Sequence, residues 1–167
     1  VLLASAISLR GRRVLLVDAD PKHASLEWRQ KARGDVLPTA ISAPIGDAAS
    51  LVPLSKGFDI TIVDLPGAPG IADSFYAHAD VGIVALEPEQ AMRSTRGLKN
   101  PSVIWNRARS VELSGPDAYA RSAGFEVLGA IPEDWRVARL LVDGLRADRR
   151  SLGDDVVHAL SVLLTAL

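Results

Sequence analysis

Three aspartates follow two of the most apolar stretches of this 167-residue sequence. Asp18 comes directly after the run Val14–Val17, Asp20 lies two residues further on, and Asp64 ends the run 58–64. Carboxylates gathered at one edge of a sheet raise each other's pKa unless a cation compensates them. Mg²⁺ is such a cation, because it takes carboxylate, phosphate and water oxygens as ligands. The pattern predicts a magnesium site, while each aspartate alone could equally be the N-cap of a following helix.

The elements that must position these aspartates alternate along the chain between apolar runs and helix-like segments. Strands are expected at residues 13–18, 38–43, 58–64, 80–86, 102–106 and 126–131, and helices at 1–9, 25–33, 47–54, 71–78, 88–98, 137–145 and 152–167. Apolar runs without polar alternation are typical of strands covered on both faces, as in parallel sheets. We therefore predict an α/β fold with a doubly wound, mostly parallel sheet and helices on both faces, in a single domain over residues 1–167.

Composition excludes several classes of protein. The chain has no cysteine, so it holds neither a disulfide scaffold nor a thiolate metal site. Its apolar runs are far shorter than a membrane span. The formal net charge is −1, so a nucleic-acid contact would have to come from a local basic patch.

Ligands of parallel sheets gather beyond the carboxyl ends of the strands, and this places further candidates there. Residues 106–107 lie at the end of the strand expected at 102–106, and residues 132–134 follow the strand expected at 126–131. These positions would line the same edge of the sheet as the aspartates.

Taken together, these segments resemble the ParA/MinD group of P-loop ATPases. Leu3–Pro21 is similar to the stretch that follows the phosphate loop in that group, and it contains the motif Val-Asp-Ala-Asp-Pro. Phe58–Gly67 resembles the group's Walker B strand and switch, and Ala79–Pro88 resembles the next strand. The chain looks most like ParA-type (ParF-like) DNA partition ATPases.

The resemblance implies roles for individual residues. Asp20 matches the residue that positions or activates the attacking water, and Asp18 matches an acid close to the metal and phosphates. Asp64 matches the Walker B acid that holds Mg²⁺ through water. Pro66 and Gly67 match a switch that responds to the terminal phosphate. Asn106, Arg107 and Pro132 would line the adenine pocket, so the implied cofactors are ATP and Mg²⁺.

One part of the family pattern is absent. The sequence has no G-x-x-x-x-G-K-[ST] and no Gly-Lys dipeptide, so it lacks the backbone N–H groups and the lysine that bind phosphates. In the family, a central strand and this loop precede the helix expected at 1–9. We expect that the given chain lacks its first strand and phosphate loop. The alternative is a degenerate relative that acts as a non-catalytic binding scaffold.

The resemblance also bears on cellular role. MinD-like positioning ATPases carry a basic amphipathic C-terminal helix that lies on membrane, whereas residues 152–167 contain neither Lys nor Arg. ParA-type partition ATPases bind DNA non-specifically as ATP-bound dimers. Five arginines near the C-terminus could contact phosphates or form a solvated helical face: Arg136, Arg139, Arg146, Arg149 and Arg150.

The favoured hypothesis is therefore a ParA-like ATP hydrolase for plasmid or chromosome segregation. It would be cytoplasmic and associated with the bacterial nucleoid. Its expected partners are a second copy of the chain, non-specific DNA and a ParB-like or other centromere-binding protein, with no membrane partner. A MinD-like positioning ATPase remains an alternative.

Overall fold

The computed structural model describes residues 1–34, 36–44, 46, 48–67, 73–86, 102–108, 114–137, 139 and 154–166. The chain divides into two compact units, each with its own parallel sheet. The first unit contains residues 1–79 and 135–152, and the second contains residues 80–134 and 153–167. The single domain expected over residues 1–167 stays a prediction.

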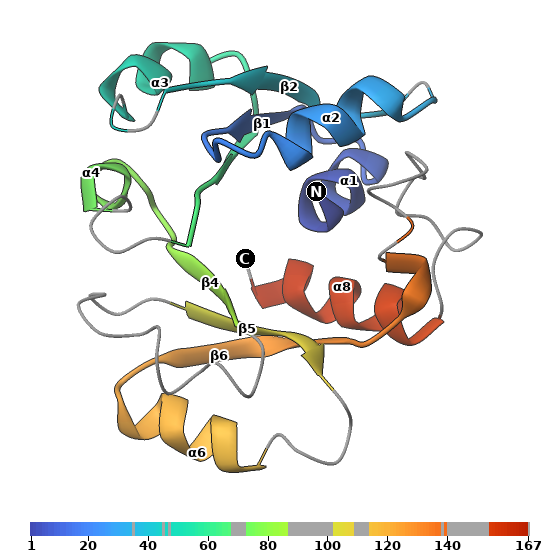
Figure 1. The fold of residues 1–167 in the computed structure, drawn as a ribbon, viewed down its shortest axis with the longest axis vertical. Coiled ribbons are helices and arrows are strands. Elements are labelled where there is room, and N and C mark those ends of the chain that lie inside the picture. Colours follow the sequence, from blue (N-terminus) through green and yellow to red (C-terminus); the bar gives the residue numbers. More distant parts are fainter. Residues whose placement is uncertain are drawn as a thin grey trace. The chain divides into compact units, whose positions relative to one another are not determined.

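The sheet of the first unit has three parallel strands in the order β2-β1-β3 (Figure 1). These strands are β1 (Val14–Asp18), β2 (Thr39–Ser42) and β3 (Ile60–Asp64). All five residues of β1 are buried, as its unbroken apolar run predicts for a central strand of a parallel sheet. The flanking strands are shorter or more exposed, because each has one neighbour in this sheet.

Helices cover both faces of this sheet. They are α1 (Leu2–Leu9), α2 (Ala24–Lys31), α3 (Ala48–Ser55) and α4 (Asp73–Tyr76). Figure 1 shows α1 and α2 on one face and α3 and α4 on the other. Leu15 and Val17 pack with Leu51 of α3 and Phe75 of α4. Trp28 of α2 is fully buried on the other face. Alternate residues of β1 point to opposite faces of the sheet and therefore pack into two hydrophobic layers.

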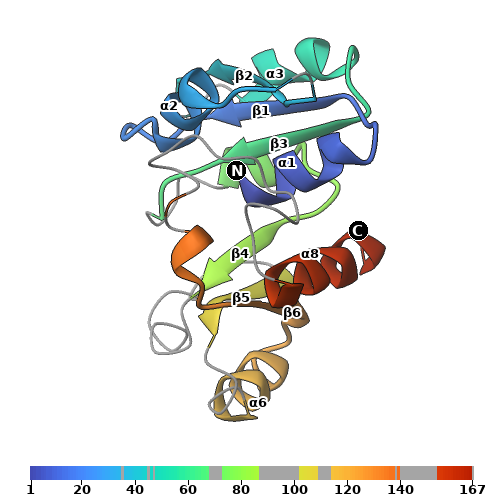
Figure 2. The same ribbon diagram turned by 90° about the vertical axis from the view of Figure 1, so that its right-hand side faces the viewer.

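The second unit repeats this layered arrangement. Its strands are β4 (Ile83–Leu86), β5 (Ser102–Ala108) and β6 (Glu126–Pro132), parallel and in the order β4-β5-β6. The helices α6 (Ser114–Ser122) and α8 (Asp154–Ala166) cover opposite faces (Figures 1 and 2). Trp105 packs in the layer under α6, while Ile104 packs against Leu163 of α8.

A bulge in β6 accommodates α8. The pairing of β5 with β6 shifts between Val103 and Ile104, so that Ile104 lies opposite Gly129. Gly129 has φ +155°, and a Cβ added there would lie 3.3 Å from Leu163 Cδ2. Glycine therefore allows the strand and the helix to approach closely at this point.

These sheets confirm the predicted α/β class, and the differences from expectation are local. Helix α6 was not expected, although Pro116 in its first turn and Gly124 after its end are ordinary helix boundary signals. The helix expected at 71–78 is only the single turn 73–76. The helix expected at 88–98 lies outside the described residues, as does most of the one expected at 137–145.

Candidate active site at the carboxyl ends of β1 and β3

Asp18 and Asp64 are the last residues of two neighbouring parallel strands. They are partners in the pairing of β1 with β3, so the two strands end at the same level. The hydrogen bonding between the two strands continues one residue further, because the Ala19 N–H donates to the Asp64 carbonyl oxygen at 2.9 Å. The structure therefore brings the acids predicted from sequence to one edge of the sheet.

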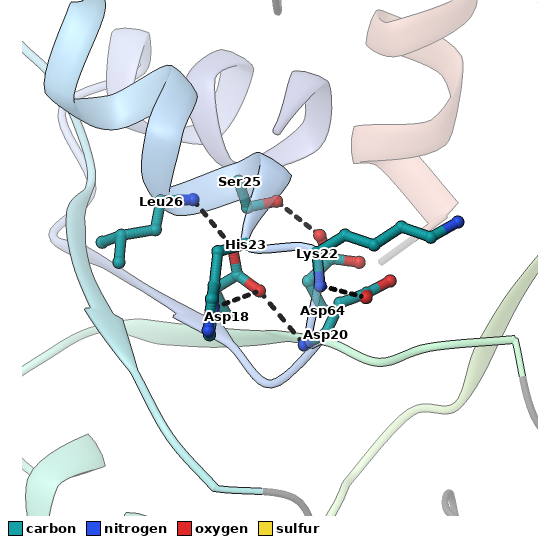
Figure 3. Close-up of polar contacts among 7 residues, drawn as sticks. All are labelled: Asp18, Asp20, Lys22, His23, Ser25, Leu26 and Asp64. Carbon is teal, nitrogen blue, oxygen red and sulfur yellow. Dashed lines mark hydrogen bonds and ion pairs between the residues drawn. The ribbon is translucent and has the colours of Figure 1, made fainter.

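The carboxylate of Asp18 is completely buried and holds the start of α2. Its Oδ2 accepts a hydrogen bond from the Leu26 N–H at 2.8 Å, and its Oδ1 accepts one from the Asp20 N–H at 3.1 Å (Figure 3). Leu26 is the third residue of α2, where the N–H has no partner within the helix. Asp18 thus satisfies an N–H group in the first turn of α2, although the N-cap residue of this helix is His23.

His23 forms the sharp turn between the acidic loop and α2. It precedes the first residue of the helix, has a left-handed backbone with φ 51° and ψ 30°, and gives no side-chain cap. Its Nδ1 lies 3.9 Å from Asp18 Oδ1, and its side chain is 47% exposed. A protonated His23 would therefore partly offset the buried charge of Asp18.

Asp20 is the more accessible acid of the loop. Its Oδ1 accepts a hydrogen bond of 2.8 Å from the Lys22 N–H, which closes a tight turn. Its Oδ2 accepts no hydrogen bond from a residue that the structure describes. One oxygen of Asp20 is therefore available to a water molecule or a ligand.

Asp64 is held by a residue that the sequence did not single out. The Ser25 hydroxyl, in the first turn of α2, donates to Asp64 Oδ2 (Figure 3). Ser25 is 2% exposed, and the two residues lie 39 positions apart in the chain. Asp64 Oδ1 accepts no hydrogen bond within the described part of the chain. Nothing in the sequence pairs these residues, because the contact depends on how α2 lies over β3.

Val1, the N-cap of α1, lies within the electrostatic influence of the same acids. The N-terminal end of α1 therefore lies close to the carboxyl ends of β1 and β3. A helix N-terminus attracts anions because its N–H groups have no partners within the helix.

These acids fit a hydrated Mg²⁺ better than a directly ligated one. Among the described residues, no group of three or more His, Asp and Glu is placed to hold a metal ion. Backbone N–H donors compensate Asp18, and they occupy both of its oxygens. Asp20 and Asp64 each keep one oxygen that could bind a water of a hydrated cation.

The other predicted site residues are placed less completely. Pro66 is partly buried and Gly67 is exposed, and the segment that follows them lies outside the described residues. Asn106 is partly buried in β5 of the second unit, and Pro132 ends β6. Arg107 lies in β5, but its side chain is not described. The proposed adenine contacts and the aspartates thus belong to different units.

The arginine-rich segment is described only at its beginning. The Arg139 guanidinium lies over the Trp135 ring, 5.6 Å from its centre, and Trp135 is 65% exposed. Arg136 and Arg139 both make interactions within the protein. Arg146, Arg149 and Arg150 lie outside the described residues.

Parallel sheets flanked by helices, with acids where the strands end, define the class of α/β nucleotide-binding proteins. The chain belongs to the CobQ/CobB/MinD/ParA nucleotide binding domain family, and the sequence model of this family matches residues 1–147. A search of the curated proteins found no match.

Several solved structures share this fold. The MinC:MinD cell division complex of Aquifex aeolicus has 16% identity, with 99% of this chain and 87% of that chain covered and a TM-score of 0.74. A ParA family ATPase from Chlorobium tepidum has 14% identity, coverage of 98% and 89%, and a TM-score of 0.68. A putative plasmid partition protein of Borrelia burgdorferi, bound to AMPPNP, has 16% identity, coverage of 98% and 89%, and a TM-score of 0.63. The resemblance and the P-loop ATPase fold predicted from sequence are confirmed.

Proposed function

We propose that this protein is a ParA-like ATPase that segregates plasmid or chromosomal DNA as an ATP-switched dimer. The observation that carries the ATPase part is the pair Asp20 and Asp64 at the edge of the sheet where α1 begins, each with one carboxylate oxygen that accepts no hydrogen bond from the described residues. Bound nucleotide phosphates and hydrated Mg²⁺ would meet both the acids and the helix N-terminus there.

The three aspartates would have different roles in hydrolysis. Asp64 would hold Mg²⁺ through a water molecule, and Asp20 would orient the water that attacks the terminal phosphate. Asp18 would act by fixing the loop and α2, since both of its oxygens already accept backbone N–H groups. Mg²⁺, when bound, would offset the negative charge of the phosphates.

Other residues would bind the nucleotide and transmit its state. Asn106, Arg107 and Pro132 would contact the adenine base. Pro66 and Gly67 would respond to the terminal phosphate. A centromere-binding partner of the ParB type would stimulate hydrolysis, and the protein would reside in the cytoplasm on the nucleoid.

Helix α8 does not fit the basic membrane-binding helix of a MinD-like role. It begins with Asp154 and Asp155, and its buried residues Val156, Leu160 and Leu163 form the face that packs on β6. The apolar face is therefore already occupied, and the helix lacks the cations that bind anionic lipid. No described helix is long and apolar enough to span a membrane.

The test is nucleotide-dependent binding by the full-length natural protein. With ATP and Mg²⁺, it should dimerise and bind random-sequence DNA, and it should be released on exchange to ADP. ATP-dependent binding to anionic lipid vesicles instead of DNA would favour the MinD-like role. Failure to bind any nucleotide would favour the degenerate scaffold. Sequencing upstream of Val1 for G-x-G-K-[ST] is the quickest accompanying check.

A further inference from the structure

The first turn of α2 contacts both acids that end the neighbouring strands. Ser25 donates its hydroxyl to Asp64, and the next residue, Leu26, donates its N–H to Asp18 (Figure 3). Two consecutive residues of one helix thus bind the last residues of β1 and β3. A shift of α2 would therefore move a hydrogen-bond donor of each carboxylate.

The hydroxyl of Ser25 limits how Asp64 can turn. A carboxylate with no partner can rotate about its Cβ–Cγ bond, whereas one with a buried hydroxyl donor on Oδ2 loses much of that freedom. Ser25 is itself 2% exposed, so no competing solvent reaches its hydroxyl easily. Asp64 Oδ1 is left without a bond from the described residues.

We propose that Ser25 is a positioning residue for Asp64. Its hydroxyl holds Oδ2 and so presents Oδ1 to a water of the hydrated Mg²⁺ that accompanies the nucleotide. This inference rests on the proposed function, because it takes Asp64 as the acid that binds that water. Partners that orient a metal-binding group in this way typically change metal affinity when they are removed.

The decisive measurement is the Mg²⁺ dependence of nucleotide binding in the full-length protein. A fluorescent ATP analogue is titrated into wild type and Ser25→Ala at rising Mg²⁺ concentrations. In Ser25→Ala, the Mg²⁺ concentration for half-maximal binding should rise about 10-fold, while binding without Mg²⁺ stays unchanged. Ser25→Thr keeps the hydroxyl and should restore the wild-type midpoint. Ser55→Ala removes an exposed hydroxyl that donates to the Val52 carbonyl, and it serves as the control.

Two results would overturn the proposal. One is a Mg²⁺ midpoint in folded Ser25→Ala that equals wild type, and the other is a shifted midpoint that Ser25→Thr does not restore. A merely structural serine would lower stability without moving the midpoint, so the two roles are separable.

A ligand-free measurement separates this proposal from the proposed function. In a double-mutant cycle with Ser25→Ala and Asp64→Ala, followed by urea unfolding, the folding equilibrium constants should show a coupling of about 10-fold. Absence of coupling would refute the positioning role even if ATP binds. Wild type that binds no nucleotide, together with a clear coupling, would refute the ATPase proposal and leave the positioning of Asp64 supported.

Discussion

The main-chain N–H of Leu26 donates a hydrogen bond of 2.8 Å to Oδ2 of the fully buried Asp18. This bond links the carboxyl end of the central strand to the start of the following helix. The family resemblance places Asp18 near the metal, but both oxygens of its carboxylate accept main-chain N–H groups of the protein itself. The arrangement makes Asp18 a residue on which the geometry of the whole loop depends.

We expect Asp18→Ala to lower the free energy of unfolding by about 1–3 kcal/mol, because two partly buried N–H groups lose their acceptor. Urea unfolding followed by circular dichroism measures this change. Asp20→Ala is the matched control, since it removes an acid whose hydrogen bond is exposed. Its expected loss is below about 0.5 kcal/mol. Equal losses in the two variants would show that Asp18 does not support α2.

Asp20→Ala should retain ATP binding and lose hydrolysis, because the water would no longer be oriented. Steady-state turnover should fall by at least about 100-fold, while the affinity for ATP stays near wild type. Asp59→Asn, which neutralises an acid just before β3 at its opposite end, should keep wild-type turnover. Unchanged turnover in Asp20→Ala would remove Asp20 from the mechanism.

Substituting Arg149 and Arg150 with Glu should abolish ATP-dependent binding to random-sequence DNA at moderate salt. Phosphate contacts supply most of non-specific affinity, and reversing two charges replaces attraction with repulsion. Fluorescence anisotropy across a salt series gives both the affinity and its salt dependence. Reversing the exposed Arg10 and Arg12 keeps the change in net charge the same and should weaken binding far less. If the variant still binds DNA with the wild-type salt dependence, Arg149 and Arg150 do not contact the DNA phosphates.

The Arg13–Asp59 ion pair should stabilise the protein in a defined pH range. The Arg13 side chain bonds Asp59 at 2.9 Å, and this bond, together with the Arg13 N–H, lowers the pKa of the Asp59 carboxyl. Because this pKa is lowered, the pair stabilises the folded state at pH values above the pKa of Asp in the unfolded chain, which is about 3.9. The stabilisation is lost as the pH falls through the pKa of Asp59 in the folded state.

Thermal unfolding of wild type and Asp59→Asn from pH 7 to pH 2.5 checks this expectation. Wild type should have the higher Tm at neutral pH, and the difference should close below about pH 4. High salt should reduce the difference, since the pair is largely exposed. A difference in Tm that persists unchanged to pH 2.5 would mean that the charge of Asp59 is not responsible.

Much of the fold was predictable because its strands are short apolar runs with clear ends. Val14–Val17 is wholly buried, as an unbroken apolar run predicts. The boundaries were less accurate: the strand expected from residue 58 begins at Ile60, and the strand expected to end at 106 continues to Ala108. Helix α6 was not predicted because its sequence, Ser-Gly-Pro-Asp-Ala-Tyr-Ala-Arg-Ser, has few apolar residues.

The candidate site was predictable in its residues but not in their roles. The position of Asp18 and Asp64 at strand ends follows from the local sequence, and their proximity follows from parallel pairing. The sequence left open that an aspartate holds the start of the following helix, but the partner residues Leu26 for Asp18 and Ser25 for Asp64 could not be predicted. Both depend on the direction in which α2 leaves the loop, which tertiary packing determines.

The left-handed backbone of His23 restricts which residues this position can accept. Glycine and asparagine adopt that conformation readily, whereas the β-branched residues Val, Ile and Thr are strained by it. The imidazole makes no cap, so the backbone shape at residue 23 is what sets the spacing between the acids and α2.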